Sequence, residues 1–164
     1  MPHALACANY DGRGCARTIG DDPERDRLEK LSGELGMVER VRFIGFRNIS
    51  ETPHELASCD IVVAPSLLDL RVQVVAEAMA PGAVVGASSN TGVWGRGDLL
   101  EDGVTGRVYR SGDPDHLAEV LKELIADLDR RAMLRAAGVE RALGQGQDAF
   151  VANLERAVAV IGHG

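Results

Sequence analysis

The sequence predicts an α/β fold in which a parallel β-sheet is covered by helices on both faces and is followed by a helical C-terminal tail. Apolar runs of strand length alternate along the chain with amphipathic runs of helix length. The runs at 61–65 and 83–88 are continuously apolar, as in strands that are buried on both faces. Glycine, proline and aspartate separate the runs and mark the expected turns.

The expected elements follow in a regular order. A short strand at 15–19 precedes a helix at about 23–35, which starts at Asp22 and Pro23 and stops at Gly36. Leu28, Leu31 and Leu35 recur at helical spacing and form the apolar stripe of this helix. The remaining expected strands lie near 41–44, 61–65, 83–88 and 106–109, and the remaining expected helices lie at 53–58, 71–80, 113–128, 130–142 and 148–161.

Composition excludes several classes of function. The chain has 164 residues, 45% of them hydrophobic, which predicts one domain with a sizeable core. A net charge of -7 argues against nucleic acid or an anionic membrane as the main partner. The three cysteines, Cys7, Cys15 and Cys59, lack CxxC or paired histidine spacing, which argues against a disulfide framework or a structural zinc site. No apolar stretch approaches the roughly 20 residues of a transmembrane helix, and a cytoplasmic location is expected.

The candidate site lies beyond the carboxyl ends of the strands, where ligands bind in open parallel sheets. The loops that start at Gly20, Pro65 and Ser88 should converge there. Asp69 and Glu77 stand eight positions apart, where a loop leads into a helix. This spacing is slightly over two helical turns, so the two acids can address different parts of one ligand. A nucleotide-sugar, with its separate polar groups, is such a ligand.

Four segments of the chain carry a specific family resemblance. They read GDDPERDRLEKLSGELGMVERVRFIGF, DIVVAPS, EAMAPG and EDGVTGRVYRSGDPDHLAEVLKELIAD. In this order and approximate spacing they resemble the donor-binding half of family 4 (group 1) retaining glycosyltransferases. The resemblance implies a Rossmann-like domain of the GT-B arrangement and sugar transfer from a nucleotide-sugar without a metal. It covers 18–164, whereas 1–17 match poorly, so the first strand-helix unit with its two basic residues and the whole acceptor half are expected to be missing.

The resemblance also implies roles for individual residues. The first acid of the family pattern falls on Asp69, which would face the donor sugar as a catalytic-site residue, and the second falls on Glu77, which would bind the ribose hydroxyls. Gly20 matches a glycine of the family's first turn, and Asp98 stands where a glutamate is usual. Backbone donors from Ser88 to Gly92 would touch the donor. Without the resemblance, Asp69 is equally readable as a helix cap and Glu77 as a solvated helix acid.

The chain departs from the family between the two acids, where Leu70, Arg71 and Val72 replace the sequence GFG. Glycines in a phosphate-binding turn permit positive φ and close approach of the backbone, and a β-branched valine resists both. Arg71 would contact the diphosphate through its guanidinium group, or else lie in solvent as an ordinary surface arginine. Trp94 would stack on a base or a sugar, or pack at the surface.

Two functions follow from these observations. The first is a truncated or split glycosyltransferase donor domain that binds a nucleotide-sugar, requires no other cofactor, and works with an acceptor-domain chain or as a homo-oligomer. The second is a catalytically inactive nucleotide-binding or assembly domain derived from such an enzyme. The loss of GFG and of the basic pair predicts that the isolated chain is inactive or weakly active.

Overall fold

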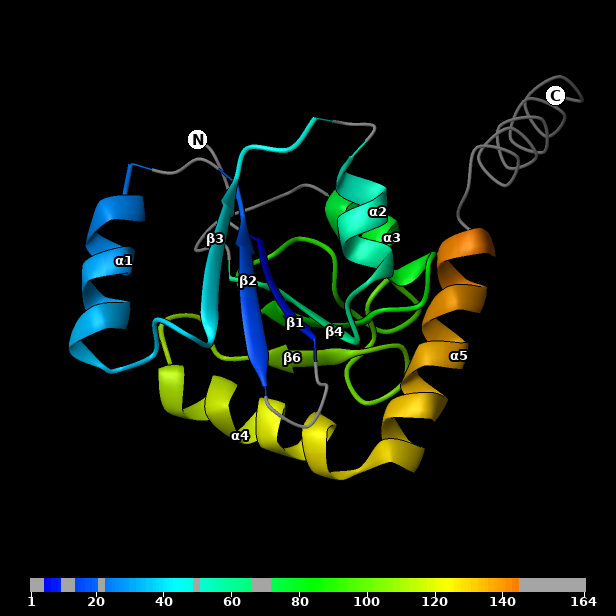
Figure 1. Ribbon diagram of the computed structural model, residues 1–164. Helices are drawn as coiled ribbons and strands as arrows, with labels where there is room; N and C mark the ends of the chain where they lie inside the picture. The colour runs from blue at the N-terminus through cyan, green and yellow to red at the C-terminus, as the bar shows by residue number, and fades with distance from the viewer. Residues whose placement is uncertain (1–4, 10–13, 21–22, 49–50, 66–71, 145–164) are drawn as a thin grey trace, which may run out of the picture.

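The described residues fold around a six-stranded sheet (Figure 1). The computed structural model describes residues 5–9, 14–20, 23–48, 51–65 and 72–144. The strands are β1 (Leu5–Asn9), β2 (Cys15–Ile19), β3 (Val41–Gly45), β4 (Ile61–Ala64), β5 (Val84–Ser88) and β6 (Arg107–Tyr109). The five strands expected from the sequence are all present, within a few residues of their expected ranges. The sixth, β1, was not expected.

The strand order is β3-β2-β1-β4-β5-β6. The pairs β2–β3, β4–β5 and β5–β6 are parallel, which confirms the expected class, but β1 runs antiparallel to both of its neighbours. The antiparallel strand is thus the one that the sequence did not predict, and the expected strands that pair with one another are parallel. Asn9 pairs with Cys15, so only residues 10–14 connect β1 to β2. A parallel connection needs a crossover of about a dozen residues or more, and a link this short permits only a hairpin.

Helices cover both faces of the sheet. They are α1 (Arg25–Glu34), α2 (Thr52–Ala57), α3 (Val72–Met79), α4 (Pro114–Ala126) and α5 (Leu128–Gly144). The helix expected at 148–161 lies outside the described residues. The aspartate-proline signal at the start of α4 is confirmed, since the Asp113 carboxylate accepts the His116 N–H at 2.9 Å. This hydrogen bond, together with the Arg110 side chain, lowers the pKa of Asp113.

Two apolar clusters hold the helices to the sheet. Val62, Val85 and Val108 face one side, where α2, α3 and α5 contribute further core residues. Ile61 and Val84 face the other side and pack under α4. Because β4 and β5 bury every one of their residues, the sequence pattern of continuous apolar runs is explained by helices on both faces.

The helix α1 is less buried than its sequence pattern predicts. It lies beside β3, on the side of the sheet away from α2 (Figure 1). Leu31 and Leu35 of the expected apolar stripe are 43% and 65% exposed. Leu28, the first leucine of the stripe, is half-buried, so only part of the stripe is shielded from solvent.

No helix in the described part of the chain is long and apolar enough to cross a bilayer.

Candidate functional site

The candidate site lies at the edge of the sheet where five strands end. Ile19 pairs with Gly45, Ala64 with Ala87, and Ser88 with Tyr109, so the carboxyl ends of β2 to β6 lie along one edge. The loops after Ile19, Ala64 and Ser88 therefore leave from the same edge, as the sequence predicted. Such an edge is where ligands bind in α/β sheets.

The reversal of β1 changes what stands at the middle of this edge. Leu5 pairs with Ile19, so β1 begins at the site and ends, at Asn9, on the opposite edge. A parallel strand here would send its following loop and the start of a helix towards the site. In this chain the first residue of a strand stands there instead, and the backbone donors of a helix N-terminus are not supplied from β1.

Glu77 is carried by α3, the helix that follows β4. It lies on the second turn of α3 and is half-buried, next to the fully buried Ala78 and Met79. A wholly solvated helix face is therefore excluded for this carboxylate. Its expected partners across the site, Asp69 and Arg71, lie outside the described residues, and so does the preceding loop from Ser66 onward.

The first residue of α3 is Val72, which stands where the family has the second glycine of GFG. Among the described residues, positive φ angles occur only at glycines, so Val72 adopts an ordinary helical conformation rather than a glycine-like turn. The helix starts within one residue of the position expected from the sequence. Residue 72 does not have the positive φ that a glycine would permit at this place.

Ser88, the last residue of β5, is buried. The Ser88 hydroxyl accepts the Asn90 N–H at 3.3 Å, and the Ser88 carbonyl accepts the Thr91 hydroxyl at 2.8 Å. Ser88 and Thr91 are buried, whereas Asn90 and Gly92 are exposed. This turn presents the exposed backbone near Gly92 to solvent at the site edge and uses the serine hydroxyl internally.

Trp94 is anchored beside this turn. Its indole N–H donates to the Ser89 carbonyl at 2.9 Å, and the side chain is 42% exposed. The ring is thus fixed at one end while much of its surface is open to solvent. Either expected role, stacking on a ligand or packing at the surface, is compatible with this position.

Asp98 belongs to a tight turn that begins at Gly95. The Asp98 N–H donates to the Gly95 carbonyl at 3.2 Å, and the Gly95 N–H donates to the Leu100 carbonyl at 3.0 Å. A Cβ atom on Gly95 would collide with the Asp98 carboxylate, which folds back over it. Glycine is therefore required at position 95 for the carboxylate of Asp98 to take this place.

Gly20 ends β2 with a turn that ties two strands together. Its φ is +130°, which suits glycine, and its N–H donates to the Gly45 carbonyl at 3.0 Å. The amide of Gly20 is therefore used within the sheet edge, and its contribution to a site would be the shape of the turn. The following Asp21 and Asp22 lie outside the described residues.

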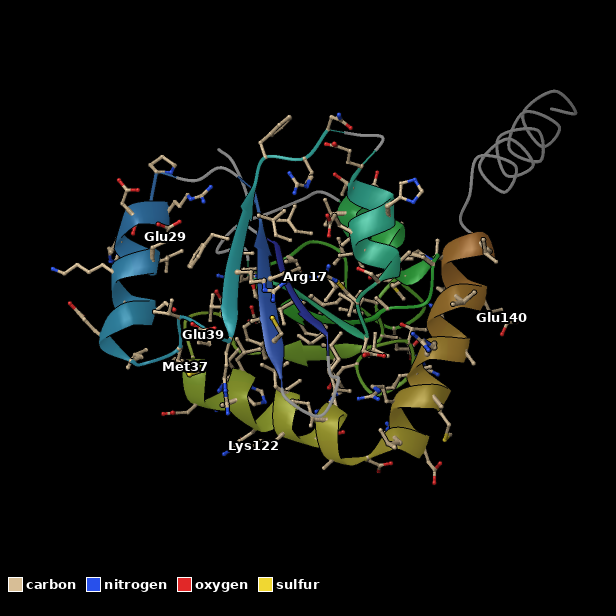
Figure 2. The ribbon with its side chains drawn as sticks, viewed as in Figure 1. Arg17, Glu29, Met37, Glu39, Lys122 and Glu140 are labelled. Atoms are coloured by element: carbon tan, nitrogen blue, oxygen red, sulfur yellow. The ribbon has the colours of Figure 1, made fainter. Side chains whose placement is uncertain are left out.

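Arg17, for which the sequence predicted no role, lies on β2 and is half-buried. Figure 2 labels its side chain on β2. The guanidinium forms an ion pair with Glu55 at 3.1 Å and donates to the Ser58 hydroxyl at 2.5 Å. The Cys59 thiol lies 3.3 Å from the same group. Arg17 therefore fastens α2 to the sheet and does not replace the basic residues of the family.

Two other arginines at the site edge were missed by the sequence analysis. Arg47 follows β3 by two residues and lies 3.5 Å from Glu55, and Arg110 directly follows β6 and lies 2.8 Å from Asp113. Both are cations just beyond the carboxyl end of a strand, and that position in the sequence is the signal that would have found them. Among the described residues, no cluster of His, Cys, Asp and Glu could hold a metal ion.

The fold and the site edge together define an α/β domain of the GT-B glycosyltransferase type, the class to which its structural neighbours belong. The chain belongs to the family described as "Glycosyl transferases group 1", whose sequence profile matches residues 16–141. The expected family and fold are thereby confirmed.

Individual relatives agree with this assignment. The chain is 34% identical over 128 residues to the lipopolysaccharide core biosynthesis glycosyltransferase LpsE of Rhizobium meliloti (strain 1021), covering 77% of this chain and 36% of LpsE. The structure of Anabaena Alr3699/HepE in complex with UDP superposes with a TM-score of 0.71 at 28% identity, covering 89% of this chain and 40% of HepE. The C-terminal domain of the group 1 protein LpcC from Francisella tularensis gives a TM-score of 0.67 at 25% identity, covering 74% of this chain and 61% of that one. The chain thus spans 36% of LpsE and 40% of HepE, less than half of either protein.

Proposed function

We propose that this chain forms the donor-binding half of a group 1 glycosyltransferase and binds a nucleotide-sugar at the carboxyl edge of its sheet. The observation that carries the proposal is the half-buried Glu77 on the second turn of α3, the helix that follows β4 in the chain. A carboxylate in this position can accept hydrogen bonds from two ribose hydroxyls, which are charge-assisted and therefore strong. The solved complexes of HepE with UDP and with UDP-glucose support a nucleotide-sugar as the ligand class.

In this proposal the domain acts by holding the donor and stabilising the leaving diphosphate. Glu77 fixes the ribose, Asp69 faces the sugar, and Arg71 contacts the diphosphate. The turns from Ser88 to Gly92 and from Gly95 to Asp98 line the side of the donor opposite these three residues. Such positioning accelerates transfer without a proton being moved by this half. The proposal also includes an acceptor and the half that binds it. This half is supplied by a partner chain or by a second copy of this chain.

A specific observation favours the second function, a nucleotide-binding or assembly domain without catalysis. Val72 opens α3 in helical geometry where the family has a glycine, and β1 reaches the site by its first residue instead of by a loop and a helix. The first change removes the positive φ and the close backbone approach that a glycine permits, and the second removes the backbone donors of a helix N-terminus. An unmatched phosphate charge that leaves water costs several kcal/mol. On this alternative the chain binds nucleotide weakly and transfers no sugar with any partner.

Titration with UDP, GDP and ADP tests the shared nucleotide site. Trp94 is the only tryptophan, so its fluorescence reports on the site edge, and backbone NMR provides a second signal. We expect saturable binding that Glu77→Ala weakens by at least about tenfold, the effect of losing hydrogen bonds to a charged group. Glu119→Ala is the matched control, because Glu119 is an exposed acid on α4.

The outcomes separate the hypotheses. Equal affinities of the Glu77→Ala and Glu119→Ala variants would exclude the ribose role of Glu77. The lack of any response to millimolar nucleotide would refute the nucleotide site as a whole. Binding followed by sugar transfer, once an acceptor half is added, would support the enzyme, whereas binding without transfer would support the second function.

A further inference from the structure

The helix α5 holds three turns of the domain through arginine side chains. Arg130 donates to the Gly103 carbonyl at 2.5 Å, and Arg135 donates to the Gly82 carbonyl. Arg141 donates to the carbonyl of Asp98. The first two carbonyls belong to turns that lie away from the proposed donor site. The third belongs to the Gly95–Asp98 turn, which the proposed function places against the donor.

Arg141 differs from the other two arginines because it makes a second contact. Its other guanidinium nitrogen lies 3.5 Å from a carboxylate oxygen of Glu101, and this same oxygen accepts the Gly97 N–H at 3.0 Å. Arg141 and Glu101 thus hold the Gly97 N–H and the Asp98 carbonyl together, on adjacent residues of one turn. Each of the two side chains is only 27% exposed, so their attraction is partly shielded from water.

The tip of the turn depends on these contacts with Arg141 and Glu101 to stay ordered. Arg96, Gly97 and Asp98 are exposed, and Gly97 has a φ of +80°, a conformation that a glycine leaves easily. An exposed turn that must be ordered on ligand binding loses affinity, because the ordering entropy is subtracted from the binding free energy. A turn that is already held in place avoids this cost.

We propose that Arg141, acting with Glu101, is a positioning residue that fixes the Gly95–Asp98 turn in the conformation that meets the donor. The proposal rests on the proposed function, because it gives that turn a ligand. It assigns to the end of α5, more than 40 residues from the turn in sequence, control over the affinity of the donor site.

The test compares Arg141→Ala, Arg141→Lys and Glu101→Gln with Arg135→Ala in the full chain. Arg135 is the matched control, since it is an arginine of the same helix that donates to a carbonyl of a different turn. Glu140→Ala controls for a change of charge, because Glu140 is exposed and points away from the sheet (Figure 2). Hydrogen exchange of the Gly97 and Asp98 amides without nucleotide reports on the turn, the dissociation constant for UDP reports on the site, and thermal unfolding reports on stability.

We expect Arg141→Ala and Glu101→Gln to speed exchange at the turn and to raise the dissociation constant for UDP about tenfold, as for lost hydrogen bonds to charged groups. Arg141→Lys should restore part of both properties, since lysine can reach one acceptor but lacks the fixed fork of arginine. Arg135→Ala should lower the unfolding temperature without changing exchange at the turn or UDP affinity.

Exchange at the turn that is the same in Arg141→Ala and Arg135→Ala would overturn the proposal. So would faster exchange with unchanged UDP affinity, because the turn would then be held for stability alone. Failure of the wild-type chain to bind UDP, GDP or ADP would overturn the proposed function and the positioning role with it, and the exchange data would still show whether Arg141 holds the turn.

Discussion

Tyr109, the last residue of β6, combines burial with an ionisable group. Only 4% of its surface is exposed, and its hydroxyl lies 3.4 Å from the Ala64 carbonyl at the end of β4. Burial raises the pKa of the phenol from 10.0 to about 12, because the phenolate loses its hydration in the core. The side chain therefore stays neutral under all ordinary conditions and links two strand ends at the site edge.

The raised pKa of Tyr109 predicts how the chain responds to alkali. In the unfolded chain the phenol ionises near pH 10, whereas in the folded chain it ionises near pH 12. The unfolded state therefore releases a proton first, and the free energy of unfolding should fall as the pH rises from 10 to 12. Denaturant unfolding across this range should show a shallower fall for Tyr109→Phe, and tyrosinate absorbance should lose its later transition. A variant that follows the wild-type pH curve throughout would show that Tyr109 ionises freely in the folded state.

Two glycines within helices differ in how closely the rest of the protein packs around them. Gly33 in α1 has open space around the position of a Cβ atom. Gly138 in α5 is buried, and a Cβ atom there would lie 3.0 Å from the Thr105 carbonyl oxygen and 3.1 Å from the methyl group of Met79. The first glycine is a weakness of its helix, and the second allows α5 to approach the β5–β6 connection.

The two glycines should respond oppositely to alanine. Gly33→Ala should raise the free energy of unfolding by up to about 1 kcal/mol, the usual gain of helix propensity. Gly138→Ala gains the same propensity but forces α5 away from a backbone atom, and overpacking of this kind costs about 1–3 kcal/mol. Its net effect should be destabilising. Urea unfolding of the pair measures both, and equal stabilisation by the two substitutions would contradict the described approach of α5.

The elements could be predicted where their sequence pattern reflects their surroundings. β4 and β5 are continuously apolar because helices cover both of their faces, and α4 begins with an aspartate and a proline that cap it. β1 could not be predicted in this way, because its sequence LACAN has no strong alternation of apolar and polar residues. Its place also depends on two strands that are far from each other in the sequence, β2 and β4. The site edge could be predicted from the alternation of strands and helices along the chain, because parallel strands place their carboxyl ends along one edge of the sheet. The hydrogen bond from Arg141 to the Asp98 carbonyl could not be predicted, since it joins residues 43 positions apart.

The whole sheet depends on β1 for its continuity. β3 and β2 form one half, β4 to β6 form the other, and β1 is the strand hydrogen-bonded to both. Its reversed direction does not weaken this link, because antiparallel pairing is slightly more stable per residue than parallel pairing. β1 therefore fills a central position in the sheet although it runs opposite to both of its neighbours.

Deletion of residues 1–13 should therefore damage the molecule as a whole. It would leave the facing edges of β2 and β4 without their shared partner, and unpaired strand edges promote aggregation. We expect loss of the cooperative thermal transition by circular dichroism and large species in size-exclusion chromatography. Deletion of residues 1–4, which precede β1, is the matched control and should leave both signals near those of the full chain. A monomeric 1–13 deletion with an unchanged transition would refute the bridging role of β1.

The hairpin at the start of the chain also sets an order of events during synthesis. The β1–β2 contact is local and can form within about 1–10 μs once both strands have left the ribosome. The other edge of β1 must wait for β4, because Ala6 pairs with Val63, 57 residues later. At about 5–20 residues per second this interval lasts for seconds, during which the free edge of β1 is open to other nascent chains. Slow translation between β2 and β4 should therefore lower the soluble yield of this protein more than slow translation after β4.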